Sequence, residues 1–279
     1  MNPLRKPLLD KPAPSWSHDL PLPIGEPSVH LCTSILSRNH MDDIYLEIPR
    51  STFRVRGVSA WLSVVPGVAS LVSIVLLGEY VISGDKLDPI LVGAMLSMLV
   101  GAIWSCAYMW RMDTAAPRDE PIRLNRARQK LYVYRFHYDG YRIFSRTAWF
   151  TKAEVYDWVD LRAEACSIYG PMGSGGLIQT VTVAVVKPGT NRVLDRFHFA
   201  HGGLEGEMYW AMAQIYMQQG PHALPKFDRP PRDWNNEKIT FNLARYLAPK
   251  VKWPEAMDLE SRTAPDQTPQ AALSGHSLI

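Results

Sequence analysis

Two long apolar runs dominate the pattern of hydrophobic and polar positions along the chain. The first covers Val58 to Leu77, the second covers Pro89 to Trp110, and neither contains a charged residue. A helix needs roughly 20 residues to cross the hydrocarbon core of a bilayer, and each run has that length. The alternative is a buried helix of a soluble protein, but such a helix normally keeps one polar face. The pattern therefore predicts a transmembrane helical hairpin over residues 58–110.

Small residues within the runs predict how the two helices pack. Gly93, Ser97 and Gly101 recur every four residues of the second run and share one face of a helix. The first run offers a comparable set, namely Ala60, Ser63, Gly67 and Ser70. We expect these two stripes to face each other.

The distribution of Lys and Arg around the runs predicts the orientation of the hairpin. The loop over residues 78–88 contains only Lys86, whereas both outer flanks are basic. Those flanking residues are Arg50, Arg54, Arg56, Arg111, Arg118, Arg123, Arg126, Arg128 and Lys130. Because basic flanks stay on the cytoplasmic side, we expect a two-pass protein with both termini in the cytoplasm. The alternative for these arginines is a specific site for anionic lipid.

The runs divide the chain into five parts. The expected parts are a loosely ordered N-terminal segment over residues 1–40, a pre-membrane segment over 41–57 with one strand, the hairpin over 58–110, a cytoplasmic domain over 119–250 and a disordered tail over 251–279. The first and last parts are rich in Pro, Ser and other small or polar residues, which is the basis for expecting little order there.

Residues 119–250 carry a β pattern followed by a helical one. Candidate strands are 122–124, 131–136, 141–144, 148–150, 177–186 and 192–199, with 155–162 as a strand or a short helical turn. Met208, Met212, Ile215 and Tyr216 have helical spacing before a stop at Gly220, and a second helix is expected over 236–247. The predicted fold is a membrane-anchored α+β protein, with antiparallel strands closed by a helix. A small barrel of the pleckstrin-homology (PH) type would fit this order.

Charge and cysteine content exclude some classes of partner. The net charge is only +3, and no block of Lys and Arg is interleaved with aromatic residues, so we expect no nucleic-acid partner. Cys32, Cys106 and Cys166 lack the spacing of a metal or redox motif and are expected to be reduced thiols.

Three groups of residues suggest chemistry but lack supporting context. Asp195, His198 and His201 could ligate a metal, yet residues three apart on a strand point to opposite faces, so we expect no convergence. The glycine-rich stretch 170–176 lacks the Gly-Lys-Ser/Thr ending of a phosphate loop. Asp157 and Asp160 form a carboxylate pair without an accompanying base. We therefore predict no catalytic residue, no cofactor-binding residue and no metal ligand.

Several short motifs resemble a group of uncharacterised proteobacterial membrane proteins. These motifs are PIRLNRARQKLYVYR over residues 121–135, WVDLRA over 158–163 and YWAMAQIYMQQGPHALP over 209–225. They contain Arg123, Asn125, Arg126, Trp158, Asp160, Trp210, Tyr216, Met217, Gly220 and Pro221. The resemblance offers no catalytic residue, and most of these positions are expected to be structural.

The resemblance also implies a place and a task. Members of that group lie in the bacterial inner membrane and are often encoded beside type VI secretion and Rhs toxin genes. It therefore implies a non-enzymatic immunity or accessory protein whose partners are membrane lipid and a secreted toxin. The alternative from the fold pattern is a membrane-tethered lipid-binding or sensory module. The oligomeric state does not follow from the sequence.

Overall fold

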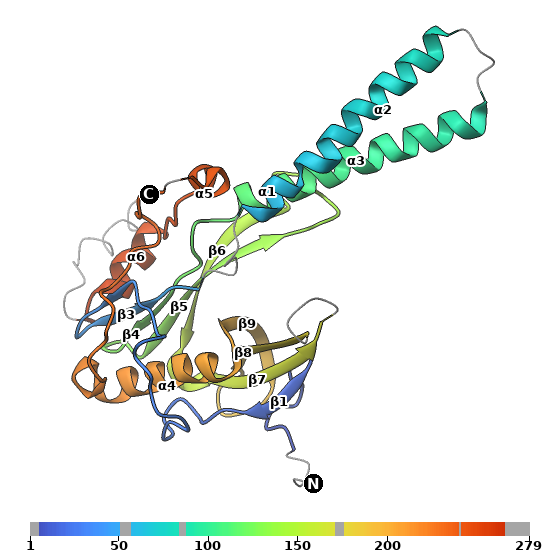
Figure 1. Ribbon diagram of the computed structural model, residues 1–279. Coiled ribbons are helices and arrows are strands. Elements are labelled where there is room, and N and C mark those ends of the chain that lie inside the picture. Colours follow the sequence, from blue (N-terminus) through green and yellow to red (C-terminus); the bar gives the residue numbers. More distant parts are fainter. Residues whose placement is uncertain (1–5, 51–56, 84–87, 171–175, 240, 266–279) are drawn as a thin grey trace, which may run out of the picture.

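The computed structural model describes residues 6–50, 57–83, 88–170, 176–239 and 241–265. Two long helical stretches project as a pair from a domain built of two sheets, which we call the sheet domain (Figure 1). The first stretch has 25 residues and the second has 27, and both are apolar and long enough to cross a membrane. The two apolar helices predicted from the sequence are thus present. Their bounds are α1 Val58–Leu62, α2 Val64–Ile82 and α3 Pro89–Ala115.

A buried carboxylate joins the two helices at their base. Asp113, in the last turn of α3, accepts hydrogen bonds from the backbone N–H of Gly57 at 3.0 Å and of Ala60 at 2.8 Å. These N–H groups belong to the first turn of α1, where no intrahelical acceptor is available and a negative charge is favourable. Asp113 therefore caps α1 from the neighbouring helix and holds the two ends of the hairpin together.

The face that α3 turns toward α2 differs from the predicted one. A Cβ built on Gly67 of α2 would lie 3.5 Å from Sγ of Cys106, so Cys106 marks the facing side of α3. A Cβ on Gly93 or Gly101 would meet no described atom within 4 Å. Asp113 lies about two turns beyond Cys106 and shares its face, whereas Gly101 lies on the opposite side. The cap made by Asp113 thus sets the rotation of α3, and the stripe predicted there is wrong.

The first sheet has five antiparallel strands in the order β2-β3-β4-β5-β6. The hairpin is inserted between β3 and β4, which pair with each other from Tyr45 opposite Asn125 to Ile48 opposite Ile122. β4 and β5 pair with each other across a short connection, with Asn125 opposite Lys130. The bounds are β2 His40–Met41, β3 Tyr45–Ile48, β4 Ile122–Asn125, β5 Lys130–Tyr138 and β6 Trp149–Asp157.

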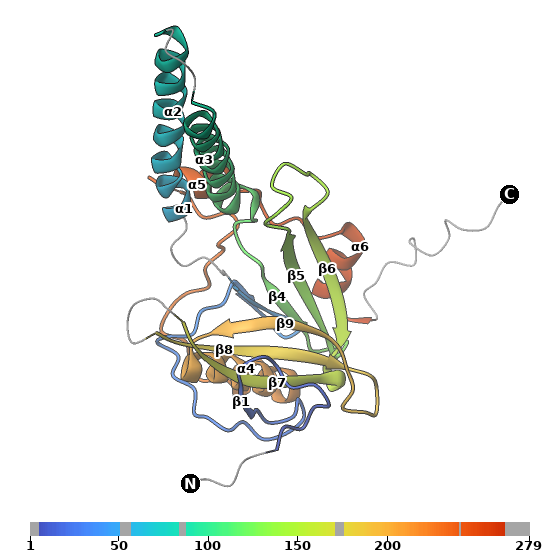
Figure 2. The same ribbon diagram turned by 90° about the vertical axis from the view of Figure 1, so that its right-hand side faces the viewer.

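The second sheet has four antiparallel strands in the order β1-β7-β8-β9 (Figure 2). The expected strands 177–186 and 192–199 are confirmed as β8 and β9. A single 3-10 turn, η1 Trp158–Asp160, leads from β6 into β7 and from one sheet to the other. Among the described residues neither sheet closes into a barrel, so the PH-like barrel was wrong, although the antiparallel α+β class holds. The bounds are β1 Trp16–Asp19, β7 Leu161–Tyr169, β8 Leu177–Val186 and β9 Val193–His201.

The helix expected near residue 212 is α4 Gly203–Gln219, and it packs on the second sheet. Met212 and Tyr216 are fully buried, while Ile215 is only partly buried. Trp210 and Met217 lie off this stripe and are buried as well. The Trp210 ring contacts Phe199 of β9 and Trp158, with ring centroids 5.6 and 5.1 Å away, so this side of α4 also faces the sheets. The N-terminal segment lies beside Trp210 and accepts a hydrogen bond from its Nε1.

The N-terminal segment therefore differs from its expected loose order over residues 6–40. Its proline-rich part offers carbonyl oxygens, which accept hydrogen bonds from buried side chains. Trp210 Nε1 donates to Pro21 at 2.9 Å, and Gln214 Nε2 donates to Leu22 at 2.6 Å. Proline removes backbone donors but keeps acceptors, so an extended proline-rich strand suits this role. Its composition alone resembles that of a disordered segment.

The C-terminal part contains less helix than predicted before residue 250 and more after it. The helix expected over 236–247 is only the single turn α5 Leu243–Leu247, capped by Asn242. The tail expected to be disordered contains α6 Glu255–Arg262, which lies against β4; residues 266–279 lie outside the described part. The strand expected over 141–144 belongs instead to the loop between β5 and β6.

Replacing Asp113 by Ala tests the cap at the base of the hairpin. The variant leaves two N–H groups of α1 without their acceptor, so we expect stability to fall by about 0.5–2 kcal/mol. Thermal unfolding of the full-length protein in detergent would show this as a lower Tm. Asp228→Ala is the matched control, since Asp228 is exposed and no hydrogen bond of its side chain is seen. Equal Tm values for the two variants would contradict the assignment.

Candidate functional site

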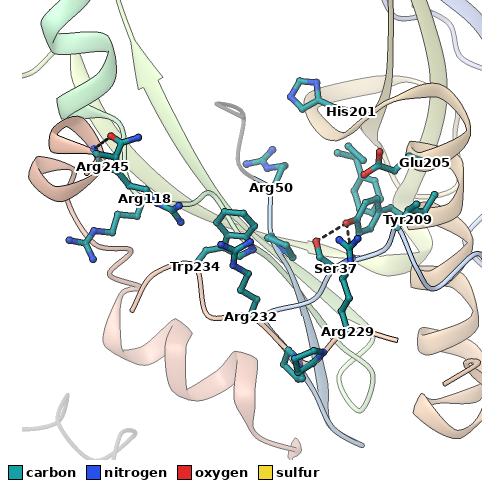
Figure 3. Close-up of a pocket in the computed structure, with 17 residues that line it drawn as sticks. Ser37, Arg50, Arg118, His201, Glu205, Tyr209, Arg229, Arg232, Trp234 and Arg245 are labelled. Atoms are coloured by element: carbon teal, nitrogen blue, oxygen red, sulfur yellow. Dashed lines mark hydrogen bonds between the residues drawn. The ribbon is translucent and has the colours of Figure 1, made fainter. Parts of the chain in front are cut away.

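The site with the most distinctive chemistry is an open pocket between the two sheets and the base of the hairpin (Figure 3). Its volume is about 600 Å³. Asn242 in its wall lies beside Gly57 at the start of α1, since a Cβ on Gly57 would be 3.1 Å from Oδ1 of Asn242. The polar and aromatic residues that line it are Ser37, Arg50, Arg118, Phe199, His201, Glu205, Tyr209, Arg229, Arg232, Trp234, Asn242 and Arg245.

The charge of this lining is strongly positive. Five of the lining residues are arginines, and Glu205 is the single carboxylate among the described residues that line the pocket. The arginines come from four places in the chain: the segment after β3, the segment after α3, the loop over 229–234, and α5. The fold thus collects guanidinium groups that are far apart in the sequence, and we call the result the arginine pocket.

Arg50 is the fixed, structural member of the arginine pocket. Its guanidinium is buried and donates to the backbone oxygens of Glu120, Tyr134 and His198. Its Nη2 also lies 3.5 Å from the Glu120 carboxylate. Burial lowers the pKa of Arg50, with Glu120 and Asp119 opposing that shift. Because its donors are already used, Arg50 contributes charge and rigidity to the pocket rather than free donors.

Two further arginines share one carboxylate and one aromatic ring. Arg232 and Arg245 both donate to Glu237, the second at 3.1 Å. Their guanidinium carbons lie 4.0 and 4.9 Å from the ring centroid of Trp234. Two positive charges against one carboxylate leave a positive excess, and the cation–π contacts hold both groups in place. This part of the wall is therefore preorganised and cationic.

Arg118 and Arg229 supply the charge that is least compensated. Among the described residues, neither forms an ion pair with a carboxylate. Arg118 donates only to the backbone oxygens of Asn235 and Tyr246, and its Nε is buried without a hydrogen-bond partner. The Arg229 side chain is exposed at the mouth, where Figure 3 shows it close to Ser37 and Tyr209. These two residues have donors available for a ligand.

The arrangement suits recognition of an anion. Guanidinium groups bind carboxylates and phosphates through two parallel hydrogen bonds. Trp234 and the neighbouring prolines offer an apolar surface beside the charges. Tyr209 is held in the wall by hydrogen bonds with the backbone N–H and the hydroxyl of Ser37, both at 2.9 Å. The pocket can therefore hold a ligand with an anionic head and an apolar part.

The structure corrects the expectation about the histidines at the end of β9. His198 and His201 converge, with ring centroids 4.1 Å apart. A β-bulge causes this: Thr182 pairs with His198 and Val181 with Ala200, so Phe199 is an extra residue. The bulge shifts the alternation by one and places both rings on one face. Asp195 does not join them, because it binds Arg135 and Tyr156.

Two imidazoles are too few for a typical protein metal site. Within the described residues no group of three His, Cys, Asp or Glu side chains could hold a metal ion. Both ring nitrogens of His198 are buried without a hydrogen-bond partner in that part of the chain. Burial lowers the pKa of His198 to about 3, and the charges of His201 and Arg50 add to this shift. His198 is therefore a neutral, buried residue next to Phe199, which lines the arginine pocket.

The first group of motif residues lies outside the arginine pocket and contacts the C-terminal segment. Arg123 is buried, binds Glu47 and pairs with Asp258 of α6 at 2.6 Å. Asn125 is buried and donates to backbone oxygens of Ser261 and Thr263, at 3.0 and 3.1 Å. Both residues thus fasten α6 to β4.

The second group holds α4 between the second sheet and its neighbours. Trp158 and Trp210 stack with ring centroids 5.1 Å apart, and Tyr216 donates to the backbone oxygen of Asp42 at 2.8 Å. Gly220 has a φ of 93° at the end of α4, and a Cβ there would lie 3.3 Å from the Arg126 guanidinium. Pro221 begins the short turn η2 Pro221–Ala223, and Asp160 ends η1, half-buried.

The other candidate groups stay apart. The centre of the glycine-rich stretch, residues 171–175, lies outside the described residues. Cys32 is exposed, Cys166 is buried in β7, and Cys106 lies in α3, so the three thiols are distant in the fold. Burial raises the pKa of Cys166, which disfavours the reactive thiolate.

The arginine pocket was not predicted from the sequence, because arginines beside apolar runs are expected for membrane orientation alone. Arg50 and Arg118 flank the apolar runs, where basic residues are expected for orientation alone. The stretch Arg229-Pro-Pro-Arg-Asp-Trp234 places two arginines close to one tryptophan, and this was a local signal of a binding surface. Nothing in the sequence places that stretch beside Arg118.

The low pKa of His198 predicts how stability depends on pH. The unfolded chain binds a proton near the ordinary value of 6.5, whereas the folded chain does so only near 3. The unfolded state thus carries more protons in this window, and stability falls as the pH drops from about 6.5 toward 3. His198→Phe should flatten this fall, as read from Tm against pH, and keep or raise stability at pH 7. His30→Phe, at an exposed histidine, should keep the wild-type slope; an unchanged slope in His198→Phe would refute the assignment.

Comparison with known proteins gives a family but no characterised relative. No curated protein and no solved structure matches the chain. The chain matches the family DUF6708, described as a family of unknown function, over residues 99–265. This range contains most of α3, both predicted motif groups and all of the arginine pocket that follows α3. Since the match covers more than half of the chain, the chain belongs to this family.

Proposed function

We propose that this chain is a non-enzymatic binding protein, anchored in the bacterial inner membrane by its helical hairpin, that recognises an anionic group in the arginine pocket. The observation that carries the proposal is the pair Arg118 and Arg229, which lie in a preorganised cationic cavity without a carboxylate partner in the described chain. Hydrogen bonds to charged groups contribute about 1.5–3 kcal/mol each, so two such residues suffice for useful affinity.

The proposed topology places both termini and the sheet domain in the cytoplasm. The excess of arginine on both outer flanks of the hairpin supports this orientation. The pocket then opens beside the cytoplasmic end of α1, close to the headgroups of the inner leaflet. An anionic lipid headgroup and a soluble phosphate or carboxylate share the chemistry that the pocket fits. A lipid ligand would make the protein a lipid-binding module, and a soluble one would make it a sensor.

Thermal stability of the full-length protein in nanodiscs tests the proposal. A ligand of the folded state raises Tm, and two arms separate its sources. One arm adds inorganic phosphate to phosphatidylcholine nanodiscs, and the other compares these with nanodiscs containing phosphatidylglycerol. In the arm whose anion raises the Tm of the wild type, Arg118→Gln or Arg229→Gln should weaken binding of that anion roughly ten- to hundredfold.

Arg192→Gln is the matched control for the pocket. Arg192 is exposed beside the turn between β8 and β9, away from the pocket lining, and the substitution removes the same charge. Its response to the anion should equal that of the wild type. The proposal fails if neither anion stabilises the wild type, or if Arg229→Gln and Arg192→Gln respond alike.

A second candidate is an immunity or accessory protein for a type VI secretion toxin. The motifs over residues 121–135, 158–163 and 209–225 support it through their resemblance to proteins encoded near such toxins. In this case the anionic group is an acidic segment of the toxin, and the partner covers roughly 1,200–2,000 Å² of total surface. Tethering at the membrane would raise the local concentration of the binding site.

Competition between strains tests the second candidate. A strain that lacks this gene should lose to toxin-armed kin, and the wild-type gene should restore its survival. Restoration by Arg192→Gln but not by Arg229→Gln would place the toxin in the arginine pocket. A deletion strain that competes as well as its parent contradicts the immunity role. The anion-binding proposal is then decided by the thermal-stability measurement in nanodiscs.

A further inference from the structure

The loop between β5 and β6 exposes large aromatic side chains without a neighbour to cover them. Tyr141 is 92% exposed and Phe144 is 73% exposed. Arg142 and Arg146 alternate with them and are exposed as well. Burying an aromatic side chain of this size is favourable, so such a loop is expected to meet a partner. The chemistry of the partner follows from where the loop lies.

The loop is fixed at the level of the apolar helices. A Cβ on Gly140 would lie 3.4 Å from Cε2 of Tyr108, and Tyr108 belongs to the second apolar run. One turn further along α3, Arg111 donates to the backbone oxygens of Ile143 and Ser145. The tip of the loop therefore reaches the last turns of the helix that enters the membrane.

A second exposed segment flanks the hairpin at the same level. Phe241 is fully exposed and Tyr246 is 68% exposed, on and just before α5. Asn242 lies between them and contacts the position of Gly57, where α1 begins. Figure 1 shows α5 and the β5–β6 loop on opposite sides of the base of the hairpin. Asn242 lies beside Gly57, and the loop contacts Tyr108 and Arg111, so both segments lie against the hairpin within about two turns of its base.

We propose that these two segments form an interfacial rim that rests in the headgroup layer of the same bilayer that the hairpin enters. The rim consists of Tyr141, Arg142, Phe144, Arg146, Phe241 and Tyr246. Aromatic rings prefer the interface between hydrocarbon and water, and arginines beside them meet lipid phosphates. The inference rests on the membrane anchoring in the proposed function but is independent of the arginine pocket.

Continuity with the helices favours a bilayer over a protein partner for the rim. The rim residues lie on both sides of the base of the hairpin. If the helices enter a bilayer, its surface must lie at that base. Interleaved arginine and aromatic residues match the anionic, amphipathic surface of the inner leaflet. With the rim seated, the sheet domain is held against the membrane on two sides instead of swinging on the hairpin alone.

Spin labels on the full-length protein in phosphatidylglycerol-containing nanodiscs test the rim. In a background with the three cysteines replaced by serine, single labels are placed by Phe144→Cys and Phe241→Cys. Leu194→Cys is the aqueous control, at a 60% exposed residue of β9 in the sheet away from the hairpin, and Val72→Cys is the lipid control in α2. Collision rates with oxygen and with a water-soluble nickel complex report the depth of each label.

The rim predicts intermediate depth at both test positions. The rate with the nickel complex at positions 144 and 241 should be severalfold lower than at 194 but higher than at 72. If the label at position 72 is in lipid while the nickel collision rates at positions 144 and 241 equal the rate at position 194, the rim is refuted and the membrane anchoring stands. If 72 itself is aqueous, anchoring and rim are both refuted. In a third measurement, Arg142→Glu with Arg146→Glu should raise the nickel rate at 144; no change would refute the role of the arginines.

Discussion

The fold depends on a topological constraint: the apolar helical hairpin is inserted between two strands that pair with each other. β3 and β4 lie side by side in the first sheet, so the two ends of a stretch of more than 60 residues must meet again at its base. Asp113 meets this constraint by accepting hydrogen bonds from the first turn of α1. The same contact sets the rotation of α3 and thereby the faces that α3 shows to α2 and to Trp149.

Aromatic side chains also join α3 to the first sheet. Trp104 and Tyr108 stack in α3 at 5.4 Å, and Tyr108 meets Trp149 of β6 at 6.5 Å. Arg111 lies over Trp149 at 4.8 Å and also holds the β5–β6 loop. The hairpin is thus joined to the sheet domain by a cap on one side and by an aromatic contact on the other. These two attachments keep the arginine pocket beside the base of the hairpin.

Local patterns predicted the elements that are stabilised locally. The apolar runs follow from their length and lack of charge, and the strands β8 and β9 follow from their branched residues. The place of α4 follows from helical spacing, although its burial extends beyond the predicted stripe to Trp210 and Met217. The N-terminal segment does not follow, because its order comes from hydrogen bonds that Trp210 and Gln214 donate across nearly 190 residues. The pairing of His198 with His201 depended on one bulge at Phe199, which reverses the side-chain alternation. The arginine pocket is assembled from distant segments, so only the tertiary structure brings Arg118 near Arg229.

The place of the hairpin between β3 and β4 has a consequence for biogenesis. During synthesis β3 leaves the ribosome before both apolar helices, and β4 leaves after them. The strand that must pair with β3 is therefore missing until both helices have been made. The first sheet then assembles only after the hairpin has brought its ends together, so contacts of long sequence separation form last. A chain whose hairpin fails to form would leave the edges of β3 and β4 unpaired and prone to aggregate, which couples the pairing of the first sheet to the correct formation of the hairpin.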